Sequence, residues 1–187
     1  MIDEVRKAGI TILEGGIILY PTDTIWGIGC DATNPDAVQK VYQIKQRSDG
    51  KSMLVLMNGT PMLSRYLDHI PESAKEIIAS AAKPTTIIYP CAKNFAPNLL
   101  AEDGSIGIRI TFDPFCQQLI ELTGKPIVST SANISGKPPA TAFKEIDEIV
   151  RKQVDHVVEW RQKEITSSIP STILKLDTHG RITVIRP

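Results

Sequence analysis

The residues best suited to chemistry in this chain form four polar clusters, each placed where an apolar stretch ends. The first cluster is residues 20–24 (YPTDT), followed closely by residues 26–29 (WGIG). Small hydroxyls after a buried strand can bind a small polar ligand, and glycines let the backbone approach it closely. A hairpin turn capped by its own Asp and Thr side chains explains the same residues and is the simpler interpretation of this cluster alone.

The second cluster is residues 45–51 (KQRSDGK), which place three cations at the end of an expected helix. The helix dipole favours cations at that end, so a purely structural role is one interpretation. A turn at Gly50 would bring Lys51 back toward Lys45 and Arg47, and such a group suits a polyphosphate. The cluster alone supports both interpretations equally.

The third cluster is residues 129–136 (STSANISG), in which a buried strand runs into four hydroxyls and an amide. These groups and their backbone N–H donors could bind a phosphate or a carboxylate without a P-loop. A Ser/Asn turn that satisfies its own backbone is the alternative. The density of hydroxyls favours the ligand site.

The fourth cluster comprises Arg109, Arg186 and the turn at residues 167–172. Arg109 lies in the apolar strand pattern of residues 106–110 (IGIRI). If the isoleucines on either side of Arg109 face the core, Arg109 faces the other side together with Gly107. There it is either solvated or an anchor for a ligand that carries a carboxylate.

Several familiar catalytic patterns are absent from the sequence. There is no Walker-type phosphate loop, and Gly27 and Gly29 stop one glycine short of a dinucleotide-binding pattern. The three histidines, at positions 69, 156 and 179, are far apart and no Ser-His-Asp pattern is visible, so we expect them to be structural or on the surface. Catalysis by positioning and charge neutralisation is therefore expected rather than a covalent nucleophile.

The elements that position these clusters alternate along the chain. A helix over residues 2–14 is expected to end at Gly15, and further helices are expected to open at Asn34, Thr60, Ile70, Asp113 (to about 122) and Thr141 (to about 152). Expected strands cover residues 17–20, 25–30, 53–57, 86–89, 106–111, 127–128, 154–158, 172–176 and 182–185, and residues 136–139 are expected to be loop. Some strands are joined without room for a helix, which predicts one α/β layer structure with a mixed parallel and antiparallel sheet.

Composition narrows the functional classes. The 187 residues suit a single domain, 1–187, and equal numbers of acidic and basic residues (21 each) argue against a protein that coats nucleic acid, although a local basic patch is compatible. No apolar run is long enough to span a bilayer, and no signal-peptide core follows the charged N-terminus. Three cysteines without metal-ligand spacing predict buried thiols and a cytoplasmic protein with neither structural metal nor disulfide.

Taken in order, the clusters resemble the YrdC-like family of threonylcarbamoyl-AMP synthases. The matching stretches are residues 20–24 and 26–29, Lys45-x-Arg47, residues 129–136, residues 170–172 (PST) and residues 185–187 (IRP), so the resemblance covers nearly the whole chain. Most members carry a Trp-Pro-Gly-Pro-like segment before the central strand. Here residues 81–86 (AAKPTT) keep only Pro84 and Thr86 of it.

The resemblance implies an α/β fold in which a twisted mixed sheet, flanked by helices, surrounds a large concave basic cavity. It implies that L-threonine, bicarbonate and ATP react to threonylcarbamoyl-AMP and pyrophosphate. The product would pass to a separate complex that modifies tRNA beside the anticodon. Two alternatives stay open: a non-catalytic RNA-binding module of the same fold, and a YciO-like relative of uncertain activity. The intact Lys45-x-Arg47 and Ser131-Ala132-Asn133 favour the synthase.

The resemblance also implies roles for individual residues. The L-threonine site would comprise Thr24, Arg109, Ser129 and Ser171. The nucleotide site would comprise Lys45, Arg47, Lys51, Ser105, Ser131, Asn133 and Arg186. The first two of these would be catalytic, by neutralising charge as pyrophosphate leaves. Mg²⁺ would accompany ATP on phosphate oxygens and water, and no protein side chain is assigned to it.

Overall fold

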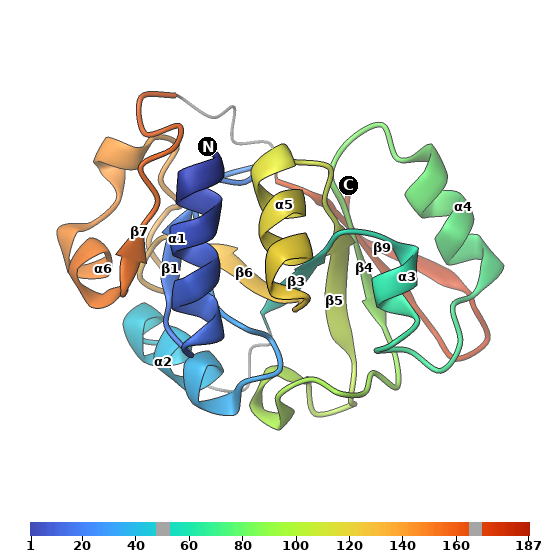
Figure 1. The fold of residues 1–187 in the computed structure, drawn as a ribbon. Helices are drawn as coiled ribbons and strands as arrows, with labels where there is room; N and C mark the ends of the chain where they lie inside the picture. The colour runs from blue at the N-terminus through green and yellow to red at the C-terminus, as the bar shows by residue number, and fades with distance from the viewer. Residues whose placement is uncertain (48–52, 165–169) are drawn as a thin grey trace.

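The protein is built around one mixed sheet, seen in a computed structural model that describes residues 1–47, 53–164 and 170–187 (Figure 1). Its strand order is β7-β1-β2-β6-β3-β5-β4-β8-β9. The pairs β1–β7, β3–β5 and β4–β8 are parallel, and the other neighbouring pairs are antiparallel, which confirms the mixed sheet. The strands are β1 Ile18–Tyr20, β2 Gly27–Gly29, β3 Leu54–Met57, β4 Thr85–Tyr89, β5 Ile106–Ile110, β6 Ile127–Ser131, β7 His156–Val157, β8 Thr172–Leu176 and β9 Ile182–Arg186.

The helices begin and end at the residues that local chemistry favours. Asn34 caps α2 by accepting hydrogen bonds from the amides of Asp36 and Ala37, and Asp113 caps α5 in the same way. Each cap is followed by proline at the first helical position, where no amide is needed. The helices are α1 Ile2–Leu13, α2 Pro35–Lys45, α3 Thr60–Leu63, α4 Glu72–Ser80, α5 Pro114–Thr123 and α6 Glu148–Gln153, with 3₁₀ turns η1 Pro97–Leu99 and η2 Phe143–Glu145.

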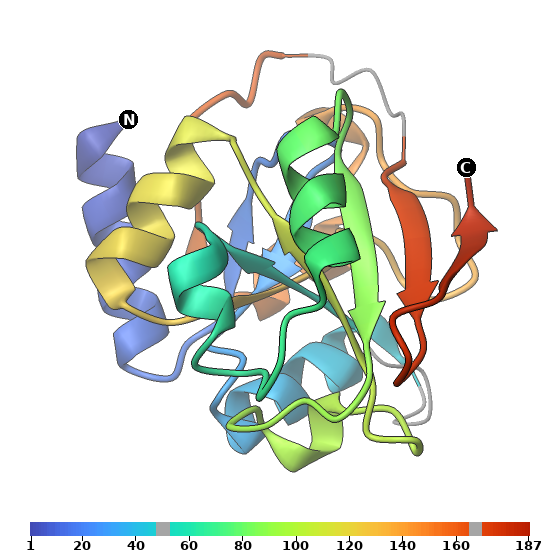
Figure 2. The same ribbon diagram turned by 90° about the vertical axis from the view of Figure 1, so that its right-hand side faces the viewer.

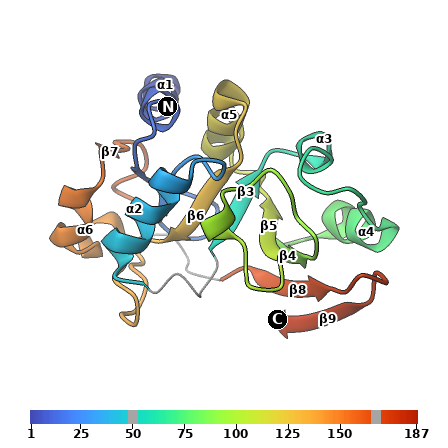
Figure 3. The same ribbon diagram turned by 90° about the horizontal axis from the view of Figure 1, so that it is seen from below.

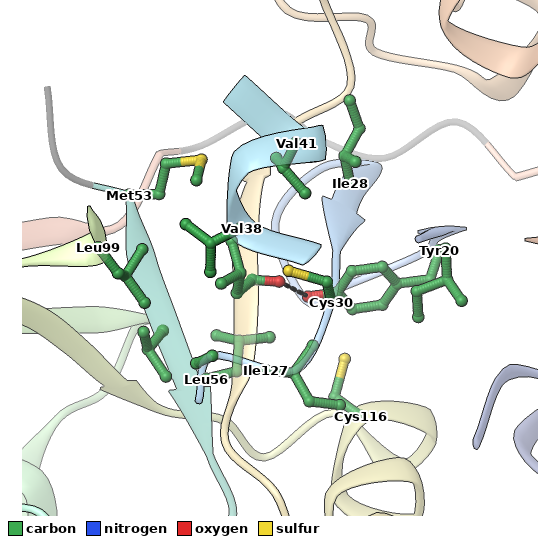
Figure 4. Packing of buried hydrophobic residues seen from close by; sticks show 14 of the residues in the cluster. Tyr20, Ile28, Cys30, Val38, Val41, Met53, Leu56, Leu99, Cys116 and Ile127 are labelled. Atoms are coloured by element: carbon green, nitrogen blue, oxygen red, sulfur yellow. Dashed lines mark hydrogen bonds between the residues drawn. The ribbon is translucent and has the colours of Figure 1, made fainter. Parts of the chain in front are cut away.

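The helices cover the sheet in layers. α1 and α5 lie side by side (Figures 1 and 2), and α4 lies alongside β4 and β5. Seen from below, β8 and β9 curve away from the side that carries α1 and α5 (Figure 3). In the core, Val38 of α2 packs with Cys30, Leu56 and Ile127, all of them buried (Figure 4). Among the described residues, no helix has the length and apolar character needed to cross a membrane.

Most expected elements agree with the structure to within about two residues at each end, but two differ more than that. The single helix expected from Thr141 is wrong. The Glu145 carboxylate accepts hydrogen bonds from the amides of Thr141 and Ala142, which closes the short turn η2. Asp147 then caps a separate helix, α6, by accepting from the Ile149 amide.

The strand expected over residues 127–128 runs on to Ser131, because its later residues still have pairing partners. Ser129 lies opposite Leu54 of β3, and Ser131 lies opposite Gly27 of β2. The third polar cluster therefore begins inside the sheet rather than in a loop. The cysteine expectation is also partly wrong, since Cys30 and Cys116 are buried but Cys91 is exposed.

Candidate functional site

A cavity of about 900 Å³, here called the front cavity, lies on one face of the sheet and collects most of the predicted site residues. Side chains alternate along a strand, so every second residue of β5 and β4 reaches it. From β5 these are Gly107 and Arg109, and from β4 they are Thr86 and Ile88. The predicted site residues that line it are Thr24, Arg47, Ser105, Arg109, Ser129, Ser131, Ser171 and Arg186.

The charges of the front cavity are unequal. Its described lining includes four cations and two carboxylates, and the cations are Arg47, Arg109, Lys175 and Arg186. The carboxylates belong to Glu102 and Asp103, both at exposed positions. A concave surface with excess positive charge attracts an anionic ligand, and the family resemblance implied a basic cavity of this kind.

Arg109 is the most buried cation of the cavity, with only 3% of its surface exposed. Its Nη2 pairs with Asp23 Oδ1 at 3.0 Å, and its Nη1 donates to the Thr24 hydroxyl at 3.4 Å. Its Nε is buried and has no hydrogen-bond partner among the described residues. A guanidinium held on one side by a carboxylate, with a donor left over, is suited to bind a second carboxylate in the cavity.

The loop between β1 and β2 holds Asp23 and Thr24 in place through Thr22. The Thr22 hydroxyl accepts hydrogen bonds from the amides of Thr24 and Ile25 and contacts the Thr24 hydroxyl at 3.0 Å. Burial raises the pKa of Asp23, while the charge of Arg109 opposes the shift. The turn that the sequence suggested is therefore present, and it also places two polar side chains against Arg109.

The C-terminal half of β6 contributes hydroxyls to the cavity. Ser129 is buried and Ser131 is half-buried, and both line it. Gly27 lies beside them on β2, where a Cβ atom would be 3.3 Å from the Ser129 hydroxyl. The glycine thus leaves room in front of these hydroxyls, which supports the interpretation of residues 26–29 as a site of close approach.

Lys45 and Arg47 point to different places because of the residue between them. Gln46 adopts a left-handed conformation (φ 50°) that ends α2. Arg47 lines the front cavity, whereas Lys45 is only 2% exposed. The Lys45 ammonium donates to the carbonyls of Ser131 (2.5 Å) and Asn133 (2.8 Å). In this structure Lys45 therefore fixes the chain behind the hydroxyls of β6.

The environment of Lys45 also changes its acidity. Burial is the largest cause, and together with the nearby charge of Arg47 it lowers the pKa of Lys45 to about 8. Burial likewise lowers the pKa of Arg47. Asn133 holds its own loop, because its side-chain amide donates to the Ile134 carbonyl at 3.2 Å. Lys45 and Asn133 thus belong to the wall of the site rather than to its lining.

The opposite wall joins β4, β8 and β9. The hydroxyls of Ser171 and Thr86 are 2.9 Å apart and buried. Arg186 donates from both Nε (3.0 Å) and Nη2 (2.8 Å) to the Ser171 carbonyl. Because Arg186 holds the backbone of Ser171, it connects the edge strand to the cavity.

A further polar group stands at the mouth of the cavity. Ser105 donates to Asp103 from its amide and its hydroxyl, and Lys175 of β8 pairs with the same carboxylate at 3.0 Å. The Ser105 hydroxyl bond is the largest cause that lowers the pKa of Asp103, to about 2. The sequence analysis identified Ser105 but missed Asp103 and Lys175. Lys175 follows Ile173 by two residues on β8, so both side chains lie on the face of the strand that lines the front cavity.

Two of the sequence predictions, Lys51 and residues 167–169 of the expected turn, lie outside the described residues. Thr86 was missed as a site residue, although it lines the cavity and contacts Ser171. None of the described lining residues is a histidine or a cysteine, and no cluster of metal-ligating side chains occurs in the described parts of the chain. The arrangement offers positioned donors and cations for a polyanionic ligand.

Comparisons with known proteins give the family context. The family model for Sua5, YciO and YrdC, described as "Telomere recombination", matches residues 11–187. A curated threonylcarbamoyl-AMP synthase of Hahella chejuensis is 33% identical over 81% of this chain and 83% of its own length. One of the same name from Photobacterium profundum is 30% identical over 92% of this chain and 98% of its own length.

Solved structures of Sua5 and YciO proteins have the same fold as this chain. Sua5 of P. abyssi, solved in complex with L-threonine, superposes with a TM-score of 0.87 at 26% identity over 98% of this chain. This chain spans about half (53%) of that protein. YciO of E. coli superposes with a TM-score of 0.82 at 25% identity, over 100% of this chain and 89% of its own.

Proposed function

The chain belongs to the Sua5/YciO/YrdC family, and on that premise we propose that it makes threonylcarbamoyl-AMP and pyrophosphate from L-threonine, bicarbonate and ATP. The observation that carries the proposal is one cavity with two kinds of anion site. A buried arginine with an unused donor, Arg109, lines this cavity, and Arg47 and Arg186 are separate cations of the same cavity. The curated relatives at 30–33% identity are named threonylcarbamoyl-AMP synthase.

We assign the threonine half of the site to Arg109 and the hydroxyls near it. Arg109 would bind the amino-acid carboxylate through the donors that Asp23 does not use. Thr24, Ser129 and Ser171 would then surround the rest of the amino acid, including its side-chain hydroxyl. The P. abyssi Sua5 complex with L-threonine supports a threonine site in this fold.

We assign the nucleotide half to the cations and hydroxyls of the remaining lining. Arg47 and Arg186 would neutralise the polyphosphate, with Ser131 at the α-phosphate and Ser105 near the cavity mouth. Lys51, which lies outside the described residues, is assigned to the same half from the family resemblance alone. Lys45 and Asn133 would act on the same half by fixing the chain at residues 131–133. Mg²⁺ would enter with ATP as its complex, held by phosphate oxygens and water.

The reaction needs little from the protein beyond this placement. Threonine and bicarbonate form a carbamate with loss of water, and a carbamate oxygen then attacks the α-phosphorus of ATP. The bond to pyrophosphate breaks and its charge develops near the cations. Positioned donors of this kind stabilise such charge without a covalent intermediate.

The wider setting is part of the same proposal. Residues 1–187 act as one domain, because strands from both ends of the chain lie in one sheet. The protein works in the cytoplasm and passes its product to a complex that modifies tRNA. If the protein contacts nucleic acid directly, we expect tRNA to bind at the basic cavity.

The test is product formation by the purified chain. Threonine, bicarbonate and MgATP should give threonylcarbamoyl-adenylate detectable by mass spectrometry, together with pyrophosphate whose release depends on threonine. Reactions that lack threonine or bicarbonate are the controls. No product from folded protein, combined with RNA binding that weakens with salt, would instead favour the RNA-binding module.

A further inference from the structure

A second cavity, of about 360 Å³, lies behind the strands that form the front cavity. It is lined by the alternate residues of β4 and β5, among them Ile87, Ile108 and Ile110, and by α4. We call it the rear cavity. Because Thr86, Gly107 and Arg109 face the front, the two cavities lie on opposite faces of the same two strands.

The walls of the rear cavity are apolar and incompletely filled. Five isoleucines contribute to it, at positions 77, 78, 87, 108 and 110. Directly after α4 the chain adds the small side chains of Ala81 and Ala82, and the next three residues also contribute to the lining. Protein interiors are normally close-packed, and an apolar space of this kind takes up apolar ligands when they fit.

Two carboxylates, those of Asp23 and Asp113, line the rear cavity. Asp113 is fully engaged by other partners. One oxygen of Asp113 accepts from the amides of Phe115 and Cys116, and the other pairs with Arg161 at 2.7 Å. The remaining charged lining residue is Lys83, which is exposed.

Asp23 is less fully compensated than Asp113. Among the described residues it forms one ion pair, from its Oδ1 to Arg109 at 3.0 Å, and its side chain keeps 21% of its surface exposed. Burial raises the pKa of Asp23 more than the charge of Arg109 lowers it. A carboxylate in this state is stabilised by a further cation or donor, and the rear cavity is where one can reach it.

We propose that the rear cavity is a second binding site, which takes a small organic ammonium ion with an apolar body. The ammonium group binds the Asp23 carboxylate, and the apolar body packs against the five isoleucines. The volume lies at the lower end of the range for small-molecule sites, so the ligand is small. Neither a purely apolar nor a purely cationic molecule uses both features.

The position of Asp23 makes the two cavities interdependent. Asp23 lines the rear cavity, and its partner Arg109 lines the front one. A cation on Asp23 weakens the hold of Asp23 on Arg109 and leaves more of the guanidinium charge for a carboxylate in front. By thermodynamic reciprocity, threonine on Arg109 strengthens ammonium binding by the same factor. This coupling rests on the proposed threonine site, whereas ammonium binding itself does not.

The experiment uses hexylammonium as the probe and the isoleucine methyl groups as reporters. Protein labelled at isoleucine δ1-methyls is titrated with hexylammonium, hexan-1-ol or ethylammonium, in the absence of substrates. We expect saturable shifts confined to the five lining isoleucines with hexylammonium, and at least about tenfold weaker binding of the other two probes. Equal binding of hexan-1-ol, or no shifts at millimolar hexylammonium, overturns the proposal.

Two variants locate the site. Asp23→Asn should weaken hexylammonium at least about tenfold, and the exposed Asp68→Asn is the matched control that should not. Ala81→Phe should fill the cavity and abolish the shifts. Since a bulky residue could disturb folding, the dispersion of the other methyl signals is checked first. If Asp23→Asn binds hexylammonium as the wild type does, the carboxylate has no part in binding and the proposal is wrong.

The coupling is measured separately by titrating L-threonine with and without saturating hexylammonium. We expect about fivefold tighter threonine binding in its presence, within the range for coupled sites. Hexylammonium binding without coupling would contradict the link through Arg109 and leave the second site standing. Failure of threonine to bind at all would contradict the proposed function and not the rear site.

Discussion

The front and rear cavities share β4 and β5 but differ in almost every property. The front cavity is larger and lined by hydroxyls, glycines and four cations, whereas the rear cavity is lined mainly by apolar side chains, five of them isoleucines. Both depend on the two-residue alternation of the same strands. A single sheet can thus carry a reactive face and a packing face, with the pair Arg109–Asp23 as the polar connection between them.

The largest expected effect concerns the cations of the front cavity. Arg47→Ala should lower turnover on the order of 10²-fold, because a charge that stabilises departing pyrophosphate is lost. The measurement is threonine-dependent pyrophosphate release at saturating substrates. Lys40→Ala, an exposed lysine of α2, the helix that precedes Arg47, is the control. A loss below about threefold would mean that Arg47 is only a helix-end cation.

The next effect concerns the residue that connects the two cavities. Arg109→Ala should raise the KM for threonine by about 10- to 100-fold, the scale of charged hydrogen bonds, and the KM for ATP much less. Arg109→Lys keeps the charge next to Asp23 and should show a smaller increase. Equal changes in both KM values would contradict the assignment of Arg109 to threonine.

A third prediction concerns the lysine behind the front cavity. The pKa of Lys45 is lowered to about 8, so its ammonium form is present below about pH 8 and lost above it. If this form must hold the carbonyls of Ser131 and Asn133, turnover should fall about tenfold from pH 7 to pH 9. The measurement is the pH profile of turnover at saturating substrates.

The origin of that pH limb can be checked with the neighbouring arginine. Arg47 contributes to the lowered pKa of Lys45 by charge repulsion. The residual activity of Arg47→Ala should therefore fall at higher pH than the wild type. An unshifted limb would assign the titration to a different group.

The smallest effect on chemistry is expected from the rear face. Ile78 of α4 is half-buried and lines the rear cavity. Ile78→Ala should lower the free energy of unfolding by about 1–2 kcal/mol, since apolar contacts are lost at a partly exposed site. Turnover at a temperature well below unfolding should stay within about twofold. A loss of turnover comparable to that of Arg47→Ala would show that the two faces are not separable.

Much of the fold follows from local patterns. The caps at Asn34 and Asp113 and the alternation around Arg109 were correctly interpreted from sequence, because each depends on neighbours within a few residues. The helix expected from Thr141 was wrong, since Glu145 accepts from the amides of Thr141 and Ala142 and closes a turn. Both Thr141 and Asp147 are residue types that can cap a helix, and the local sequence does not reveal which of them does so.

In the candidate site, too, the features set by neighbouring residues were predictable and those set by distant contacts were not. The polar clusters and their membership in one site were predictable, since polar side chains gather where strands end. The different directions of Lys45 and Arg47 were not, because they depend on the left-handed backbone of Gln46 and on carbonyls far along the chain.

The amino-acid sequence alone determined that this chain forms a mixed α/β sheet with cations and hydroxyls on one face and no nucleophile–base pair among its motifs. Only the tertiary structure decided that Lys45 belongs to the wall, that Asp23 supports Arg109 from behind, and that small residues after α4 leave a second cavity. The physical reason is the distance along the chain over which each kind of interaction acts. Periodicity and capping act over a few residues, whereas burial, charge pairing and unfilled volume depend on segments that meet only in the folded chain.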